Sequence, residues 1–352
     1  TPHYTILHHT TPHYPTLHHT TQHYTILPHT TPHCPMQVVI DKGIPFLDGV
    51  FPSDIEALHL APEEITPAAI RNADALFVRT RTQINKELLQ GSKVRFVATA
   101  TIGFDHIDQA YCREVGIHWV SCPGCNAQAV CDYVENVLDT LDSKQYSKTI
   151  GVIGYGHVGK LVAAMAERVG YKVMISDPPL GIGMPLEEMA SQCDIITLHT
   201  PLTYIGDYST YHLFNQTVLA QCKPNILLIN AARGGVVDEQ ALLKHLMTDQ
   251  GKDMQVAIDC WEGEPYINKT LLQQSDLASF HIAGYSIEGK MRASEMCLHA
   301  FCEFFSLPIL SINKKVVPLH GDSAPGWLCR ISDQLKAQPE NFEQLRKKYP
   351  LR

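Results

Sequence analysis

The sequence has no long uninterrupted apolar run and no excess of positive charge. None of its apolar stretches approaches the roughly 20 residues that a membrane-spanning helix needs, so no membrane span is expected. The formal net charge is −8, which gives no electrostatic reason to bind nucleic acid or an anionic membrane surface. We therefore expect no nucleic-acid or membrane partner.

Cysteine is present, but it is not arranged as in small secreted proteins. The 11 cysteines are scattered through 352 residues, and several lie inside apolar runs, as Cys131 and Cys193 do. This distribution favours reduced core thiols in a cytoplasmic protein. Cys122 and Cys125 form a C-x-x-C, and a redox pair is one interpretation. There is no second such pair for a zinc site, and we interpret the segment as a turn between domains.

The first 35 residues differ from the rest of the chain. They form a ten-residue repeat, TPHYTILHHT followed by TPHYPTLHHT and TQHYTILPHT, and they hold nine of the 19 histidines. A metal-binding tract is one interpretation. We favour a translated repeat upstream of a start at Met36 and predict no metal site. The repeat has neither the basic n-region nor the apolar h-region of a secretory signal, and we expect it to lie outside the fold.

Short apolar segments alternate with helical segments from Met36 onward, in a composition ordinary for a soluble enzyme. Strands that are apolar on both faces are typical of parallel sheets covered by helices. In the first series we expect strands at Gln37–Ile40, Ala75–Val78, Arg95–Ala98 and His118–Val120, and helices at Thr66–Arg71, Asn85–Leu89, His106–Val115 and Ala127–Leu141.

A second alternating series begins at Lys148. Two such series predict an α/β protein with two doubly wound parallel-sheet domains, a cleft between them and a short mixed C-terminal tail. In the second series we expect strands at Thr149–Ile153, Lys172–Ile175, Ile195–His199, Ile226–Asn230, Val256–Asp259 and Ser279–Ile282, and helices that include Gly159–Val169 and Glu239–Met247.

A glycine-rich sequence, G-Y-G-H-V-G, lies between an expected strand and an expected helix. In a dinucleotide site, Gly154 permits the tight turn, Gly156 lets the backbone approach a pyrophosphate, and Gly159 lets helix and strand pack closely. The helix N-terminus then offers free N–H groups to the phosphates. Asp177 follows about 20 residues later, where an acidic side chain binds the ribose hydroxyls and favours NAD over NADP. The alternative is a glycine turn in a sheet that binds no ligand.

Three chemically matched side chains follow the last three expected strands. They are Arg233, Glu264 and His281, and ligands of doubly wound sheets bind at the carboxyl ends of strands. Arginine binds a carboxylate with two parallel hydrogen bonds. Histidine can take the proton of a hydroxyl while hydride leaves the same carbon, and a glutamate can hold the imidazole. Each residue alone is compatible with a structural role, but three in this order after a nucleotide-binding sequence are much harder to explain by structure alone.

From Met36 to about Phe304 the sequence resembles the D-2-hydroxyacid dehydrogenase family, whose catalytic Arg, Glu and His match these three residues. The text after the last strand, HIAGYSIEGK, is similar to a subgroup that oxidises 4-phosphoerythronate in vitamin B6 synthesis, as are CWEGEP, PGCNA and TATIG. The resemblance implies substrate contacts from Thr80, Thr101 and Tyr285. It implies NAD contacts from Gly154, Gly156, His157, Val158, Gly159, Asp177, Thr200, Ala231, Ala232, Asp259 and Gly284.

The resemblance also implies a division of the chain. We expect a substrate (lid) domain at 36–128, an NAD-binding domain at 129–280, a return to the substrate domain at 281–304 and a partial dimerisation domain at 305–352. The family implies a cytoplasmic homodimer, although the tail resembles only part of the family's C-terminal domain and is expected to be shorter than in relatives.

Two alternatives remain open. One is another D-2-hydroxyacid dehydrogenase, of the phosphoglycerate or glyoxylate/hydroxypyruvate type. The other is an NAD-sensing binding protein of the corepressor kind. For a phosphorylated hydroxy acid, Arg79 and Arg81 are candidate phosphate ligands, with Lys290 approaching from the other side; the opposing interpretation is that both arginines are solvated.

Overall fold

The computed structural model describes residues 35–142, 148–312 and 326–349. The interpretation of the N-terminal repeat therefore falls almost entirely outside the described residues. Within the described part of the chain, no helix is both long and apolar enough to cross a lipid bilayer.

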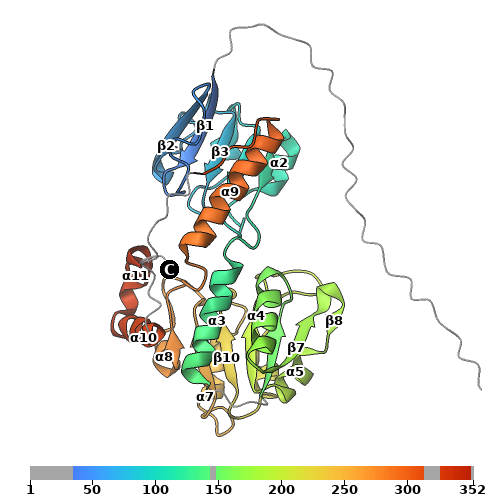
Figure 1. The fold of residues 1–352 in the computed structure, drawn as a ribbon. Coiled ribbons are helices and arrows are strands. Elements are labelled where there is room, and N and C mark those ends of the chain that lie inside the picture. Colours follow the sequence, from blue (N-terminus) through green and yellow to red (C-terminus); the bar gives the residue numbers. More distant parts are fainter. Residues whose placement is uncertain (1–34, 143–147, 313–325, 350–352) are drawn as a thin grey trace, which may run out of the picture. The chain divides into compact units, whose positions relative to one another are not determined.

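Five parallel strands form the first sheet, in the order β2-β1-β3-β4-β5 (Figure 1). They are β1 (Met36–Asp41), β2 (Ile55–Leu60), β3 (Ala75–Val78), β4 (Phe96–Thr99) and β5 (His118–Val120). The sequence did not predict β2, because this edge strand buries only Ile55 fully and carries Glu56 and His59 among its apolar residues. In this strand order the direction of winding reverses between β1 and β3, which is where such sheets bind ligands.

One helix prediction in this region is wrong. Thr66–Arg71 forms turns rather than a helix. Its single helical hydrogen bond, from the Ile70 N–H to the Thr66 carbonyl, is followed by a tighter bend from Ala73 to Ile70. Pro67 removes one donor, and so short a segment gains too few hydrogen bonds to offset helix nucleation. The neighbouring elements are η1 (Pro62–Glu64), α1 (Lys86–Leu89) and α2 (Gln109–Val115).

The second sheet has seven strands in the order β12-β11-β10-β9-β6-β7-β8. All neighbours are parallel except β7 and β8. The strands are β6 (Thr149–Ile153), β7 (Lys172–Asp177), β8 (Ile182–Gly183), β9 (Ile195–Leu198), β10 (Leu227–Asn230), β11 (Gln255–Ile258) and β12 (Leu277–Ala278). Winding reverses between β6 and β9, as in dinucleotide-binding sheets. The predicted α/β class with two parallel sheets is confirmed.

The last predicted strand, Ser279–Ile282, is wrong in position. The strand is β12, and the chain has left the sheet by Ser279. The backbone N–H groups of Ile282 and Ala283 donate to the carboxylate of Asp259 instead of continuing a ladder. His281 consequently takes a positive φ of 59°. An apolar run alone cannot reveal that a buried carboxylate captures these donors.

Helices cover the second sheet. They are α3 (Ala127–Leu141), α4 (His157–Arg168), α5 (Leu186–Gln192), α6 (Gln216–Leu219), α7 (Glu239–Leu246) and α8 (Lys269–Gln274), with the short turn η2 (Pro178–Leu180). The predictions of α3, α4 and α7 are confirmed to within two residues at each end. Val134, Val137 and Leu138 on α3 enter the core of this sheet, as their helical spacing predicted.

The chain then returns to the first sheet through α9 (Ile287–Phe304). Its Ser286 cap accepts a hydrogen bond from the Gly289 N–H. Phe301 packs against Phe77 and Phe96 of the first sheet, with ring centroids 5.6 and 6.1 Å away. Figure 1 shows α9 running along that sheet. Residues 287–304 therefore belong to the core of the first sheet although they follow the second in sequence.

The described C-terminal elements are α10 (Trp327–Ala337), η3 (Pro339–Asn341) and α11 (Phe342–Lys348). They pack on the second sheet: Ser332 accepts a hydrogen bond from the Ala278 N–H of β12, and the Phe280 and Tyr349 rings lie 5.8 Å apart. Trp327 and Phe342 are buried in the core of that sheet. This packing brings the end of the chain to the loop that carries His281.

Candidate active site

The glycine-rich loop has the geometry that its sequence predicted. Gly154 has a φ of 90°, and a Cβ there would lie 2.8 Å from the carbonyl oxygen of His199. A Cβ on Gly159 would lie 1.9 Å from the carbonyl oxygen of Gly154. At Gly156, by contrast, a Cβ would meet nothing within 4 Å. Two glycines are thus required by packing, and the middle one faces open space, as close approach of a ligand requires.

The surroundings of this loop fit a dinucleotide. Helix α4 begins at His157 with Gly156 as an N-cap that supplies no side chain, so its first N–H groups are available to an anion. Asp177 accepts a hydrogen bond of 2.7 Å from the Tyr155 N–H through Oδ2, which holds the carboxylate at the end of β7. Thr200 Oγ1 is buried without a hydrogen-bond partner among the described residues. An unsatisfied buried hydroxyl at the reversal between β6 and β9 is consistent with a bound polar ligand.

Glu264 and His281 lie in direct contact. His281 Nδ1 is 2.9 Å from Glu264 Oε2, and both side chains are largely buried. The other carboxylate oxygen, Oε1, accepts a hydrogen bond of 2.8 Å from the Trp261 N–H. Glu264 is therefore fixed through both oxygens and orients the ring through Nδ1. This leaves Nε2 as the ring nitrogen that can face a substrate.

Asp259 holds the segment that carries His281. Its Oδ1 accepts hydrogen bonds from Ser279 Oγ at 2.6 Å and the Ile282 N–H at 2.7 Å, and its Oδ2 accepts one from the Ala283 N–H at 2.9 Å. The residue is 1% exposed. Asp259 was predicted to contact NAD, and its carboxylate is already occupied by the backbone. Any contact with NAD would be additional to this structural role.

Arg233 lies on the loop after β10. Asn230 shapes that loop, since its Nδ2 donates to the carbonyl oxygens of Arg233 and Cys260, both at 3.1 Å, and its Oδ1 accepts from the Ala232 N–H. Arg233 Nη2 is 3.6 Å from the position that a Cβ on Gly103 would occupy. The guanidinium thus reaches the loop after β4, which carries Thr101.

A chain of hydrogen bonds fixes Thr101. Its hydroxyl donates to the Gly103 carbonyl at 2.8 Å and lies 2.7 Å from the Thr99 hydroxyl, which in turn is 3.0 Å from His106 Nε2. Burial lowers the pKa of His106, despite the opposing charge of Asp105, so the ring is neutral. Since Thr101 donates to Gly103, Thr99 donates to Thr101, and His106 donates to Thr99. The sequence did not indicate a role for His106, because this residue lies in no motif that marks a functional site.

Glycines at the connections between the sheets are packed against side chains. A Cβ on Gly284 would lie 2.1 Å from Asn126 Nδ2, and one on Gly124 would lie 2.9 Å from the His157 ring. Asn126 Oδ1 is buried without a partner among the described residues. The sequence analysis did not select Asn126, although PGCNA contains it. Its position beside Gly284 places it next to one of the predicted NAD residues.

The two arginines that flank Thr80 are not brought together. Arg81 forms an exposed ion pair with Glu63. Arg79 Nε lies 3.1 Å from Oδ2 of Asp41, which is fully buried at the end of β1. The two candidate phosphate ligands therefore pair with different carboxylates, one exposed and one buried. Only Arg79 points to the reversal between β1 and β3, while Thr80 between them is exposed.

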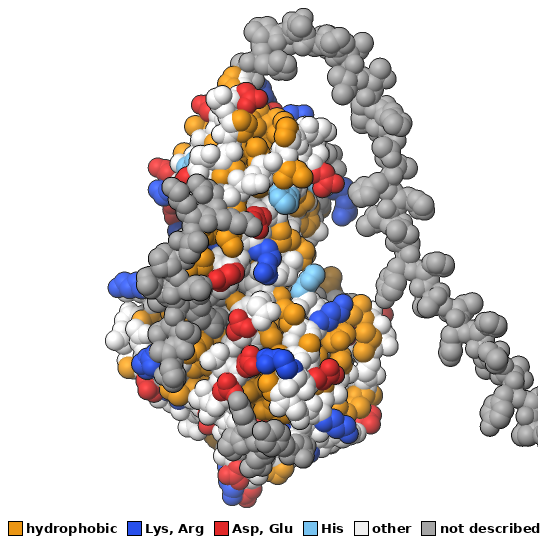
Figure 2. All heavy atoms as spheres, in the orientation of Figure 1, with side chains coloured by type: hydrophobic (Ala, Val, Ile, Leu, Met, Phe, Trp, Pro, Cys, Tyr) orange, Lys and Arg blue, Asp and Glu red, His pale blue; other side chains and the backbone are white. Residues whose placement is uncertain are grey.

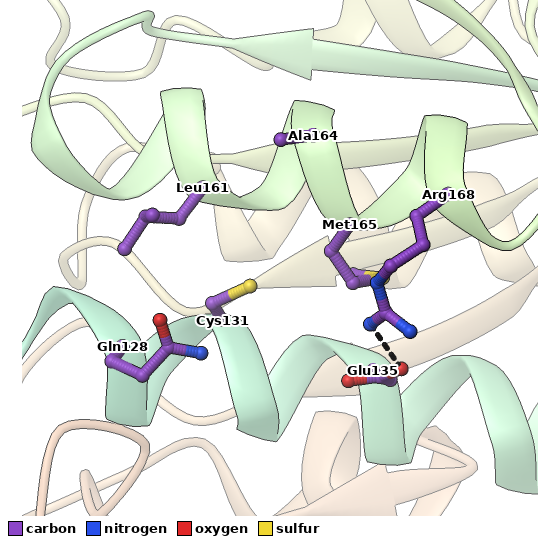
Figure 3. Close-up of a pocket in the computed structure, with 7 residues that line it drawn as sticks. All are labelled: Gln128, Cys131, Glu135, Leu161, Ala164, Met165 and Arg168. Atoms are coloured by element: carbon purple, nitrogen blue, oxygen red, sulfur yellow. Dashed lines mark hydrogen bonds and ion pairs between the residues drawn. The ribbon is translucent and has the colours of Figure 1, made fainter.

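Figure 3 shows a pocket away from these residues, between α3 and α4. Its volume is about 230 Å³, and an ion pair of 2.9 Å between Arg168 and Glu135 lies at one end. Its lining is Gln128, Cys131, Glu135, Leu161, Ala164, Met165 and Arg168. None of these is a predicted site residue, so the pocket is not the candidate active site.

The C-x-x-C segment is a turn. The Cys125 N–H donates to the Cys122 carbonyl at 3.3 Å, and both thiols are free and buried. Burial and the neighbouring Cys122 raise the pKa of Cys125 to about 12. A thiol that does not ionise near neutral pH is a poor redox nucleophile, which supports the structural interpretation. The described residues also hold no group of three or more His, Cys, Asp or Glu side chains placed to bind a metal.

Comparison with known proteins agrees with this geometry. Residues 133–283 match the family model described as "D-isomer specific 2-hydroxyacid dehydrogenase, NAD binding domain". Among solved structures, NAD+-bound 3-phosphoglycerate dehydrogenase from Entamoeba histolytica is similar with a TM-score of 0.64 and 24% identity, covering 77% of this chain and 96% of that one. D-lactate dehydrogenase from Aquifex aeolicus is similar with a TM-score of 0.59 and 22% identity, covering 76% and 95%. These likenesses concern the fold.

Curated sequences are more similar. Erythronate-4-phosphate dehydrogenase from Bacteroides fragilis strain ATCC 25285 is 40% identical over 90% of this chain and 97% of its own length. The Pseudomonas fluorescens Pf0-1 enzyme of the same name is 40% identical over 90% of this chain and 92% of its own length. The chain is an NAD-dependent oxidoreductase and belongs to the erythronate-4-phosphate dehydrogenases, within the D-isomer specific 2-hydroxyacid dehydrogenases.

Proposed function

We propose that this chain oxidises 4-phospho-D-erythronate to 2-oxo-3-hydroxy-4-phosphobutanoate, with NAD as the hydride acceptor, in the synthesis of vitamin B6. The observation that carries the proposal is the contact between His281 and Glu264, in a chain 40% identical to enzymes of that name. His281, Glu264 and Arg233 follow β12, β11 and β10, which are neighbours in one sheet.

In this proposal His281 is the general base. Its Nε2 takes the proton of the C2 hydroxyl while the hydrogen on C2 leaves as hydride, and the C2–O bond becomes a carbonyl. Glu264 orients the ring through Nδ1 and offsets the positive charge that the ring gains. The Asp259 carboxylate positions the segment on which His281 lies.

Arg233 is the proposed anchor for the substrate carboxylate, because its guanidinium can form two parallel hydrogen bonds with it. Its approach to Gly103 brings it near Thr101, the proposed partner from the first sheet. Thr80 and Tyr285 complete the proposed substrate contacts. Arg79 and Lys290 are the proposed phosphate ligands. Burial and the charge of Arg79 lower the pKa of Lys290. This is expected of two cations that lie close together in a site for an anion.

NAD would be held by the glycine loop and by the residues that line it, and when bound it supplies the hydride acceptor. The α4 N-terminus and Gly156 would receive the pyrophosphate, and Asp177 the adenosine ribose. Thr200 and Asn126 offer polar atoms that lack partners among the described residues. The remaining proposed contacts are Gly154, His157, Val158, Gly159, Ala231, Ala232, Asp259 and Gly284.

A substrate panel tests the function. Purified protein with NAD is offered 4-phosphoerythronate, 3-phosphoglycerate, glycerate and lactate, and NADH fluorescence is followed. The highest kcat/KM is expected for 4-phosphoerythronate. A higher value for 3-phosphoglycerate or glycerate would favour another D-2-hydroxyacid dehydrogenase, and NAD binding without turnover of any hydroxy acid would favour a binding protein.

We also propose the division 36–128, 129–280, 281–304 and 305–352 for the substrate, NAD-binding, returning and dimerisation segments, and a cytoplasmic homodimer. The return of α9 to the first sheet supports 281–304 as the returning segment. Helices α10 and α11 share the core of the second sheet. Light scattering behind a sizing column measures the assembly directly; a monomer at micromolar concentration would contradict the dimer.

A further inference from the structure

The C-terminal helix α11 brings a partly buried cation to the catalytic loop. Arg346 lies with its guanidinium carbon 5.7 Å from the centre of the Tyr285 ring. Its Nε is buried and has no hydrogen-bond partner among the described residues. Its Nη1 lies 3.9 Å from Glu343 Oε2, at the limit of an ion pair. Buried polar atoms in proteins normally have a hydrogen-bond partner, so the Nε of Arg346 is an unsatisfied donor.

The field around Arg346 comes from the catalytic centre. Burial opposes its charge, but Tyr285, Glu264, Glu343 and Asp259 together raise the pKa of Arg346. The guanidinium is thus electrostatically coupled to the carboxylate that orients His281. The general NAD-binding domain matches residues 133–283, and α11 lies outside them. Arg346 therefore lies outside the NAD-binding domain that the family shares.

A second cation contacts the same tyrosine. Lys290 Nζ lies 5.2 Å from the centre of the Tyr285 ring, and no carboxylate is paired with it among the described residues. Arg79, whose charge lowers the pKa of Lys290, is held in place by the buried Asp41. Lys290 of α9 and Arg346 of α11 thus both contact the Tyr285 ring. Acidic neighbours do not neutralise them fully, so the group is suited to bind an anion with more than one charge.

We propose that Arg346 binds the phosphate group of the substrate together with Lys290, with the Tyr285 ring between the two cations, and so determines specificity for phosphorylated 2-hydroxy acids. This inference rests on the proposed function and names a residue for it. A guanidinium can present two N–H groups to phosphate oxygens, and the buried Nε is one of the donors that would gain an acceptor. The C-terminal helices then have a role in catalysis through substrate binding.

The test compares Arg346→Gln with Lys347→Ala. Both changes remove one positive charge from α11, but Lys347 is 60% exposed and contacts Glu343. Arg346→Gln is expected to lower kcat/KM for 4-phosphoerythronate by about 10- to 100-fold, mostly by raising KM. This is the size of effect expected when a hydrogen bond between charged groups is lost. Because Arg346 is also coupled to Glu264, kcat/KM for unphosphorylated erythronate should fall as well, but by much less than for 4-phosphoerythronate. Lys347→Ala should change neither value. Equal losses on both substrates, or no loss on either, would overturn the proposal.

Arg346→Lys keeps the charge and is measured in parallel, in case the glutamine variant does not fold. It should retain part of the discrimination between the two substrates, with KM between those of the unmodified protein and Arg346→Gln. A lysine variant that is unchanged for 4-phosphoerythronate would contradict a role for the planar donor group.

Inorganic phosphate separates this inference from the proposed function. Phosphate should raise the melting temperature of the unmodified protein, and the rise should be much smaller in Arg346→Gln. This outcome supports a phosphate site at Arg346 even if 4-phosphoerythronate is not turned over, in which case only the proposed function fails. An equal rise in both proteins would place phosphate elsewhere and overturn the inference.

Discussion

His281 Nδ1 lies 2.9 Å from Glu264 Oε2, and the opposite oxygen of that carboxylate accepts the Trp261 N–H. The ring is therefore oriented by a group that is itself fixed to the backbone. The neighbouring Glu262 is occupied differently: its carboxylate lies 3.1 Å from His212 Nε2. Two glutamates that are two positions apart thus contact different histidines. Glu262 can therefore act as the control for mutation of Glu264.

His281→Ala should lower kcat by about 10² to 10⁴ because it removes the proton acceptor. Glu264→Gln should lower kcat less, since the amide can still contact Nδ1 but no longer offsets the charge on the ring. Glu262→Gln is the control and should leave kcat within twofold. Steady-state rates with saturating NAD measure all three. A His281 variant with near-normal kcat would require a different base.

NAD should be used much better than NADP. Asp177 ends β7 with its carboxylate tied to the Tyr155 N–H, and its charge repels a 2′-phosphate. Asp177→Ala should lower the ratio of kcat/KM with NAD to kcat/KM with NADP, chiefly by weakening the binding of NAD. The two ratios are obtained from the same enzyme preparations. Equal use of both cofactors by the unmodified protein would refute this prediction.

Changing Gly159 to alanine should lower the stability of the protein, whereas changing Gly156 to alanine should lower its affinity for NAD. A Cβ on Gly159 would lie 1.9 Å from a backbone oxygen, and overpacking of this kind typically costs about 1–3 kcal/mol. A Cβ on Gly156 meets no protein atom within 4 Å, so Gly156→Ala should keep its melting temperature and lose NAD affinity. Thermal denaturation and NAD titration distinguish them. Destabilisation by Gly156→Ala would show that the loop is tighter than the structure indicates.

Stability should fall as pH rises from 4.5 to about 7 through one buried carboxyl. Burial raises the pKa of Glu239 from 4.5 to about 7, although it accepts the Glu262 N–H. The folded state then binds a proton that the unfolded state releases, so its contribution is present at low pH and lost through pH 7, by roughly 3 kcal/mol. Glu239→Gln should make the stability depend less on pH between pH 4.5 and 7. Urea midpoints at pH 5 and 8 measure it, and an identical difference in both proteins would exclude Glu239 as the cause.

Much of the fold and site follows from local sequence. Apolar runs predicted the central strands of both sheets, because a strand buried on both faces needs apolar side chains throughout. The glycine loop was predictable because only glycine satisfies both the φ of 90° at Gly154 and the contact at Gly159. Arg233, Glu264 and His281 were predictable as residues that follow three neighbouring strands, because their order in the sequence matches the order of those strands in the sheet.

Other features depend on contacts between distant residues and so required the tertiary structure. Asp259 captures the N–H groups of Ile282 and Ala283, which ends the last strand before His281. Arg81 joins Glu63 on the surface while Arg79 joins Asp41 inside, although the two arginines are only two positions apart. Arg346 reaches Tyr285 because the apolar faces of α10 and α11 pack on the second sheet. The spacing of apolar residues indicates which face of each element is buried, but it does not indicate which other element covers that face. The covering partner is determined only when the elements pack together.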